Sequence, residues 1–179
     1  MREEIICSGF GGQGIMSMGK LLAQAALLED KQVTWMPCYG AEVRGGTAHS
    51  TVIISDEPIA SPVILWPDTC FVMNNPSLIR FEKQVKVGGL LVVNSSLAKS
   101  ETSRLDITIL KFPFTDLASQ LGNVRVANML ALGVYLAKKK IVLFKSVISS
   151  LAEIISSNPS VHKINVKALK EGMKLIKNK

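Results

Sequence analysis

The sequence predicts an α/β fold in which a mostly parallel sheet lies between helices on both of its faces. Short apolar runs alternate with helix-forming segments along the 179 residues, which is the pattern of parallel strands joined by helical crossovers. In the first unit, the apolar run 5–7 leads through a glycine-rich turn into the Ala-, Leu- and Met-rich stretch 15–28, a composition that favours helix. Hydrophobic residues make up 47% of the chain. We therefore expect one domain over residues 1–179 with a sizeable core.

The later elements follow from apolar runs and from the residues that interrupt them. The β-branched run 48–55 reads as a strand, and with its neighbour it is expected to be an antiparallel addition to the sheet. Residues 59–65 are expected to form a short hairpin or an extended segment. The other strands are expected at 32–36, 68–75, 90–96 and 106–112, and the helices at 75–87, 115–121, 126–139, 145–157 and 165–177.

Because ligands in such folds bind beyond the carboxyl ends of the strands, the polar segments at those ends are candidate site residues. Three such segments should converge at one edge of the sheet. They are residues 8–14, 73–76 and 94–96.

The turn after the first strand contains Gly9, Gly11 and Gly14 in G-x-G-x-x-G spacing, with Gly12 as an extra glycine. Glycine adopts positive φ without steric cost, and a helix that starts here would direct free N–H groups and its positive dipole end toward an anion. Plain strand-to-helix packing is the alternative explanation. A dinucleotide site also needs an acidic residue at the end of the second strand. The strand at 32–36 ends without one, which disfavours an NAD-linked dehydrogenase.

Composition excludes several classes of protein. The three cysteines include no C-x-x-C pair, so this chain alone is not expected to hold a metal or an iron–sulfur cluster. No apolar run approaches the ~18 residues needed to span a bilayer, and no signal segment opens the chain, so we expect a cytoplasmic protein without a membrane partner.

The net charge of +7 suits a polyanionic small molecule, an acidic protein or nucleic acid. The aromatic pattern of an RNA-binding sheet is missing. Solvated lysines on the terminal helices explain the charge more simply.

A second unusual loop, residues 37–47, contains an acid and an arginine among glycines. Arg44 would suit a carboxylate, a phosphate or a partner chain, or it would form a loop-bracing ion pair with Glu42. His49 is expected to be a satisfied or half-exposed histidine. The chain shows no nucleophile elbow, no P-loop lysine and no paired carboxylates. We therefore assign no catalytic residue to this chain alone and expect it to act within an assembly.

Four segments together resemble the gamma subunit of 2-oxoacid:ferredoxin oxidoreductases, and the likeness runs in order over about residues 4–135. Among the members, 2-oxoglutarate:ferredoxin oxidoreductase (2-oxoglutarate synthase) is the most similar. The pyruvate, 2-ketoisovalerate and indolepyruvate enzymes share the same motifs. The segments that carry the likeness are residues 9–14, 39–48, 53–62 and 122–129.

The resemblance implies the fold of domain III of pyruvate:ferredoxin oxidoreductase and a role in a complex of anaerobic metabolism. That complex decarboxylates a 2-oxoacid, passes electrons to ferredoxin and releases acyl-CoA. The alpha, beta and delta subunits would hold thiamine diphosphate, Mg and the iron–sulfur clusters, and this chain would help bind coenzyme A. The implied contacts to coenzyme A or phosphate are Gly9, Gly11, Gly12, Gln13, Gly14 and Arg44. The implied interface or motif positions are Tyr39, Glu42, Gly45, Gly46, Thr47 and Asn128.

A stand-alone nucleotide-binding or regulatory protein that uses the same glycine loop is the alternative from another class. A nucleotide bound tightly to the isolated chain would favour it.

Overall fold

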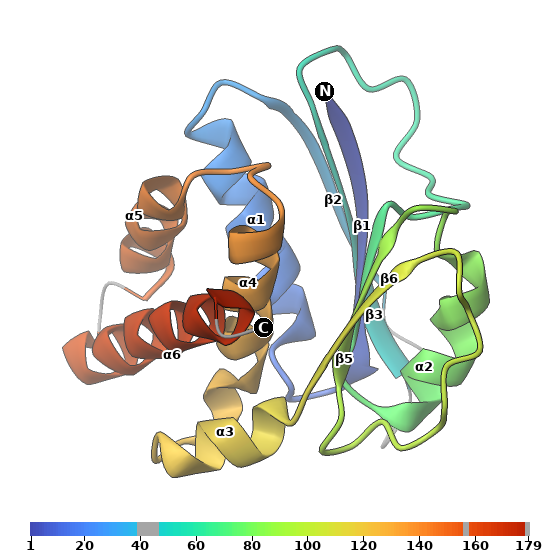
Figure 1. Cartoon of the computed structure of the whole chain (residues 1–179). Coiled ribbons are helices and arrows are strands. Elements are labelled where there is room, and N and C mark those ends of the chain that lie inside the picture. The colour runs from blue at the N-terminus through green and yellow to red at the C-terminus, as the bar shows by residue number, and fades with distance from the viewer. Residues whose placement is uncertain (39–46, 156–157, 178–179) are drawn as a thin grey trace.

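The computed structural model describes residues 1–38, 47–155 and 158–177, and one six-stranded sheet in the order β2-β3-β1-β4-β5-β6 lies at its centre (Figure 1). Strands β1, β4, β5 and β6 are parallel to one another, whereas β3 is antiparallel to both of its neighbours, β1 and β2. The predicted parallel sheet with an antiparallel addition is therefore confirmed. The strands are β1 (Arg2–Phe10), β2 (Gln32–Cys38), β3 (Thr47–Ser55), β4 (Thr69–Val72), β5 (Leu90–Asn94) and β6 (Thr108–Phe112).

The sequence of each strand matches its place in the sheet. The central strands β4 and β5 are buried along their whole length, as expected for parallel strands covered on both faces. Strand β2 lies at an edge and continues through Pro37 to Cys38, two residues beyond the predicted end. A proline is tolerated there because an edge strand pairs on one side only. Residues 59–65 form neither a strand nor a helix, so they are the extended segment and not the hairpin.

Helices cover both faces of the sheet, as predicted, but unequally. In Figure 1 most helices lie on one side of the sheet and α2 lies on the other, and a large core on the first side faces a smaller one beneath α2. The helices are α1 (Ile15–Leu27), α2 (Asn75–Phe81), α3 (Phe114–Gln120), α4 (Ala127–Lys138), α5 (Phe144–Ile154) and α6 (Pro159–Lys177), and the short 3-10 helices are η1 (Glu82–Gln84) and η2 (Val124–Val126).

Helix α6 begins at Pro159, earlier than the predicted start at 165. The Asn158 side-chain oxygen accepts a hydrogen bond from the Val161 N–H (3.2 Å), as an N-cap residue does. Pro159 then occupies the first helical turn, where its fixed φ and missing N–H are tolerated. The Asn-Pro pair is thus the local start signal that hydrophobic periodicity alone did not reveal.

Helix α4 is buried on almost every side, as its uniformly apolar sequence requires, because it lies between the sheet and α6. Two glycines allow α4 and α6 to cross at very short distance. A Cβ on Gly133 would lie 2.2 Å from the Leu169 carbonyl oxygen, and one on Gly172 would lie 2.1 Å from that of Leu130. Only glycine fits at either position.

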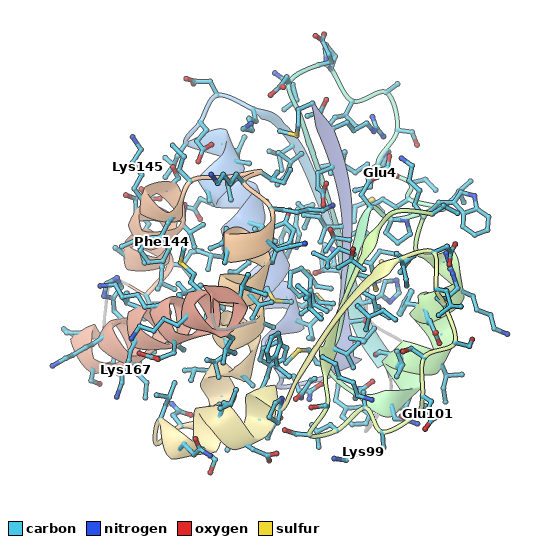
Figure 2. The ribbon with its side chains drawn as sticks, in the orientation of Figure 1. Glu4, Lys99, Glu101, Phe144, Lys145 and Lys167 are labelled. Atoms are coloured by element: carbon cyan, nitrogen blue, oxygen red, sulfur yellow. The ribbon has the colours of Figure 1, made fainter. Side chains whose placement is uncertain are left out.

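An ion pair between a buried carboxylate and the partly exposed Lys139 lies at the start of β1, at the end of the strand opposite the glycine loop. The Glu3 side chain is 6% exposed and accepts hydrogen bonds from Lys139 Nζ (2.7 and 3.0 Å) and Thr69 Oγ1 (2.6 Å). The expectation of simply solvated lysines is therefore wrong at Lys139. It is correct for Lys145 and Lys167, which are exposed on the outer side of α5 and α6 (Figure 2).

None of the helices among the described residues is long and apolar enough to cross a lipid bilayer. Within the same residues, no three His, Cys, Asp or Glu side chains come together in a group that could hold a metal ion.

Candidate functional site

The glycine loop joins β1 to α1 through two residues in the left-handed region, Gly12 (φ 89°) and Gly14 (φ 71°). Gly14 is also the N-cap of α1, and no side chain in the described part of the chain caps this helix end. The first N–H groups of a helix have no partner within the helix, and the dipole adds a partial positive charge at the same point. The loop therefore presents backbone donors that suit an anion.

Gln13 holds the loop closed. Its Oε1 accepts a hydrogen bond from the Phe10 N–H (2.6 Å), and its Nε2 donates to the Met73 carbonyl oxygen (3.2 Å). Asn94 Nδ2 donates to the same carbonyl (3.2 Å). The three polar strand ends thus meet at one edge of the sheet, as predicted. Both functional groups of the Gln13 amide are engaged inside the protein, so its position in the motif has a structural reason.

The four glycines of the G-x-G-x-x-G segment divide into two kinds. A Cβ on Gly9 would lie 2.5 Å from Gln13 Oε1, and one on Gly14 would lie 2.3 Å from Asn128 Nδ2, so both glycines allow close packing. Among the residues that the structure describes, added Cβ atoms on Gly11 and Gly12 would meet no atom within 4 Å. Gly11 and Gly12 therefore form the open surface of the loop that a ligand can approach.

Asn128 connects the loop to the start of α4. Its side chain is almost fully buried, its Nδ2 donates to the Gly14 carbonyl oxygen (3.0 Å), and its Oδ1 accepts from the Met129 N–H (2.9 Å). The amide thus holds the left-handed turn at Gly14 in place. The structure brings this predicted motif residue, distant in sequence, directly to the glycine loop.

Three hollows surround the loop, and Gly12 lines all of them. One of about 250 Å³ lies among α1, α4, α5 and α6. A second of about 370 Å³ lies toward the start of β3 and includes Ala48. A third of about 160 Å³ lies toward the ends of β4 and η2 and includes Met73. Arg125 lines the first and the third of these hollows.

Arg125 is a candidate site residue that sequence reasoning missed. The residue is exposed, and its backbone N–H donates a hydrogen bond to Asn123 Oδ1 (3.0 Å), whereas its side chain makes no hydrogen bond to the described residues. Its guanidinium therefore has no carboxylate partner in the described part of the chain. An unpaired guanidinium beside open backbone donors suits a phosphate. Its position in the segment 122–129, which carries the family resemblance, is the feature of the sequence that points to Arg125 as well as to Asn128.

In the described part of the chain, the titratable groups near this edge do not form a nucleophile–base pair. Burial raises the pKa of the Cys7 thiol to about 12 and raises the pKa of Cys70 further, so both stay protonated. Burial, with a smaller effect of Arg80, lowers the pKa of His49. The His49 ring packs against Phe81, with 5.4 Å between centroids, and its buried Nδ1 has no hydrogen-bond partner among the described residues. His49 is thus half-buried, as predicted, but not fully satisfied.

The second predicted loop is only partly placed. Thr47 is the first residue of β3, and its backbone pairs opposite Phe10 at the end of β1. The start of β3 therefore adjoins the glycine loop. Five predicted site residues lie outside the described residues: Tyr39, Glu42, Arg44, Gly45 and Gly46.

Comparison with known proteins gives consistent results. The family model for pyruvate ferredoxin/flavodoxin oxidoreductase matches residues 4–175. The 2-oxoglutarate synthase subunit KorC of Methanocaldococcus jannaschii is 40% identical over 136 residues, which cover 74% of this chain and 73% of that protein. KorC of Methanothermobacter marburgensis is 30% identical over 183 residues, which cover 98% of this chain and 97% of that protein. The ketoisovalerate oxidoreductase subunit VorA of Methanothermobacter thermautotrophicus is 40% identical over 130 residues, but this chain spans only 27% of its length.

Two solved structures have the same fold. The gamma subunit of a keto/oxoacid ferredoxin oxidoreductase from Geobacter sulfurreducens PCA superposes with a TM-score of 0.84 at 29% identity, over 97% of this chain and 95% of that one. The 2-oxoglutarate:ferredoxin oxidoreductase of Magnetococcus marinus superposes with a TM-score of 0.90 at 23% identity, over 99% of this chain and 31% of that one. At this identity the likeness supports the fold alone. The chain belongs to the pyruvate ferredoxin/flavodoxin oxidoreductase family and is of the gamma-subunit type.

Proposed function

We propose that this chain is the gamma subunit of a thiamine diphosphate-dependent 2-oxoacid:ferredoxin oxidoreductase that converts 2-oxoglutarate to an acyl-CoA. The observation that carries the proposal is the match to a KorC subunit over nearly the whole length of both chains. A related 2-oxoacid is the alternative substrate: pyruvate, 2-ketoisovalerate or indolepyruvate. One similar subunit, from Thermococcus litoralis, is named as common to the pyruvate and ketoisovalerate enzymes (30% identity, 94% of both chains), so a gamma-type subunit need not determine the substrate.

The partners in this proposal are alpha, beta and delta subunits, and ferredoxin through them. Those subunits would hold thiamine diphosphate and Mg, which support decarboxylation, and the iron–sulfur clusters, which carry electrons to ferredoxin. The chain is proposed to be one domain of a cytoplasmic complex. Its three cysteines are free thiols, which fits a reducing compartment.

The role proposed for this chain is to bind the phosphates of coenzyme A. Support comes from the backbone at Gly11 and Gly12, the start of α1 and the guanidinium of Arg125, which among the described residues are open, uncapped and unpaired, and from the net charge of +7. Arg44 belongs to the same proposal as a second cation. By fixing the phosphate end, the chain would position the reactive thiol toward the subunit that holds the acyl group, which lowers the entropic cost of acyl transfer. Coenzyme A is also named among the bound molecules of the Magnetococcus marinus structure.

The substitution Gly11→Ala in the assembled complex tests this role. Gly11 does not have positive φ, and an added methyl group meets no atom of the described residues within 4 Å, so we expect the folded chain to tolerate it. If a phosphate approaches this backbone, the methyl group obstructs it, and the KM for coenzyme A should rise by about tenfold or more. The KM for the oxoacid should not change. The exposed Lys170→Ala serves as a charge control, and an unchanged KM for coenzyme A in Gly11→Ala would contradict the proposed role.

A stand-alone nucleotide-binding protein remains the second candidate, because the open loop and its hollows would serve a free nucleotide equally well. Purification from the source cells separates the two. The first candidate predicts recovery with the other subunits, and the second predicts a solitary chain with a bound nucleotide.

A further inference from the structure

We propose that three exposed apolar side chains at the amino edge of the sheet, Trp66, Val87 and Leu105, form a docking surface for a partner subunit of the oxidoreductase. The partner is the subunit that corresponds to the part of VorA outside this domain. The inference rests on the proposed function and adds where on this chain a partner binds. The three side chains are here called the amino-edge row, and they are 61%, 74% and 100% exposed, respectively.

The members of the amino-edge row occupy equivalent positions before three neighbouring strands. Trp66 precedes β4, Val87 precedes β5 and Leu105 precedes β6, each by three positions, because these strands begin at residues 69, 90 and 108. The strands are parallel, and their first residues pair with one another across the sheet. Neighbouring strands lie about 4.8 Å apart. One large apolar side chain per strand therefore stands at the same edge of the sheet.

Hydrogen bonds tie together the loops that carry the amino-edge row. The Lys86 N–H donates to the Pro67 carbonyl oxygen (3.0 Å), and the Gly88 N–H donates to that of Asp106 (2.8 Å). Arg104 Nη2 donates to Asp106 Oδ2 (2.7 Å). Every residue in these bonds is a sequence neighbour of a member of the row, so the three loops are held side by side. A surface that is fixed before binding loses little conformational entropy when a partner docks.

The charges beside the amino-edge row favour a protein partner over a lipid surface or a nucleic acid. Lys86 Nζ lies 3.0 Å from Asp68 Oδ1, and Arg104 Nε lies 2.5 Å from Asp106 Oδ1. The two cations next to the row in sequence are therefore paired with carboxylates, whereas anionic lipids and nucleic acids attract cations that are free to bind phosphate. Exposed apolar patches mark protein interfaces, whose buried centres are rich in aromatic residues and poor in charged ones.

The lengths of the relatives indicate which protein docks here. This chain spans only 27% of VorA, so VorA contains a related domain within a much longer chain. KorC of Methanothermobacter marburgensis is matched over 97% of its length, so that subunit consists of little besides this domain. A domain that occurs in both forms needs a surface of its own that binds the remainder of the enzyme. The amino-edge row supplies an apolar surface of that kind.

A partner at the amino edge leaves the glycine loop accessible. The loop follows the carboxyl end of β1, whereas the amino-edge row precedes the amino ends of strands parallel to β1. In Figure 1 the N-terminus and the segment that leads into β4 lie at one end of the sheet, and α3, which follows β6, lies at the other. The partner and a ligand at the glycine loop can therefore bind at the same time.

The test replaces members of the amino-edge row with aspartate and measures assembly in the source cells. Each tagged variant is produced beside the untagged natural chain, so that the two compete for the same partner subunits. The subunits recovered with the tagged chain are identified by their sequences and quantified by mass spectrometry. The variants are Val87→Asp at the centre of the row and Leu105→Asp at its end. The matched control is Leu143→Asp, at an exposed leucine directly before α5.

We expect each variant of the row to recover about tenfold less of the VorA-like subunit than the tagged wild type, because a charge replaces an apolar contact of the interface. Leu143→Asp should recover as much as the wild type. Urea unfolding of the isolated variants should match that of the wild type, since the replaced side chains are exposed. Full recovery with both variants of the row would overturn the inference, as would an equal loss with Leu143→Asp.

Two further measurements on the isolated wild-type chain test other occupants of the amino-edge row. Self-association in analytical ultracentrifugation that Val87→Asp abolishes would assign the row to a second copy of the chain. Cosedimentation with vesicles of phosphatidylserine and phosphatidylcholine that the same variant abolishes would assign the row to a membrane. Either result would overturn the inference.

The recovery of partners by the tagged wild type distinguishes failure of the inference from failure of the proposed function. If the wild type and both variants of the row recover the oxidoreductase subunits equally, the docking surface lies elsewhere and the proposed function stands. If the wild type recovers none of these subunits, the proposed function and the inference both fail.

Discussion

The close crossing of α4 and α6 makes Gly172→Ala a sharp test of the packing between these two helices. The added Cβ would lie 2.1 Å from the Leu130 carbonyl oxygen and 2.9 Å from its carbon. Ordinary contact begins at 3.4 Å. The obstacle is helix backbone, which cannot rotate away as a side chain can, so the two helices must separate.

The expected loss of stability follows from two opposing effects. Overpacking of a core costs about 1–3 kcal/mol, and a backbone obstacle places Gly172→Ala near the upper end. Alanine favours helix over glycine by about 1 kcal/mol, which offsets part of the loss. The free energy of unfolding should therefore fall by about 2 kcal/mol, equivalent to roughly 4–8 °C in melting temperature for a chain of this size.

Urea unfolding of the isolated chain, followed by far-UV circular dichroism, measures this difference. The matched control is Gly19→Ala in α1, whose Cβ would meet side-chain atoms, Ser50 Oγ at 2.5 Å and Trp35 Nε1 at 3.0 Å. Because those side chains can adjust, the control should lose less stability than Gly172→Ala. If Gly172→Ala were as stable as the wild type, or more stable, the close crossing of the helices would be refuted.

Two further predictions concern buried polar groups. Lys139→Met should lower the free energy of unfolding by about 3–5 kcal/mol, because the buried Glu3 carboxylate loses its cation. The control, Lys163→Met at an exposed position, should change the free energy of unfolding little. Equal changes for the two variants in urea unfolding would show that the ion pair contributes nothing. The Cys7 thiol, with its pKa raised to about 12 by burial, should resist thiol reagents at pH 8 in the native chain while the half-buried Cys38 reacts. The Cys7 thiol of the unfolded chain loses its proton first, at about pH 9, so the contribution of Cys7 to stability should fall as the pH rises from 9 to 12. If the stability difference between the wild type and Cys7→Ala stayed constant over that range, the raised pKa of Cys7 would be contradicted.

The sequence predicted the glycine loop and the sheet edge well, because these features depend on local residue chemistry. An apolar run, a glycine turn and a helix-forming stretch together determine the β1–α1 unit. Polar residues at strand ends then converge because parallel strands share one carboxyl edge. The hydrogen bonds of Gln13 and Asn94 to the Met73 carbonyl confirm that convergence.

Features that depend on contacts distant in sequence could not be predicted in this way. Lys139 belongs to a run of three lysines, and only the fold brings it to Glu3. The pairing of Gly133 with the α6 backbone requires the crossing of two helices that hydrophobic periodicity does not specify. Arg125 becomes a candidate site residue only once η2 is seen beside the glycine loop.

Purification of the native chain from its own cells, followed by an assay of the recovered material, tests whether it is a subunit of a 2-oxoacid:ferredoxin oxidoreductase. We expect recovery with subunits that carry thiamine diphosphate and iron–sulfur clusters. We also expect viologen reduction that requires both coenzyme A and a 2-oxoacid, with 2-oxoglutarate as the best substrate. Recovery of a solitary chain with a tightly bound nucleotide, and no oxoacid-dependent reduction, would contradict the proposed function.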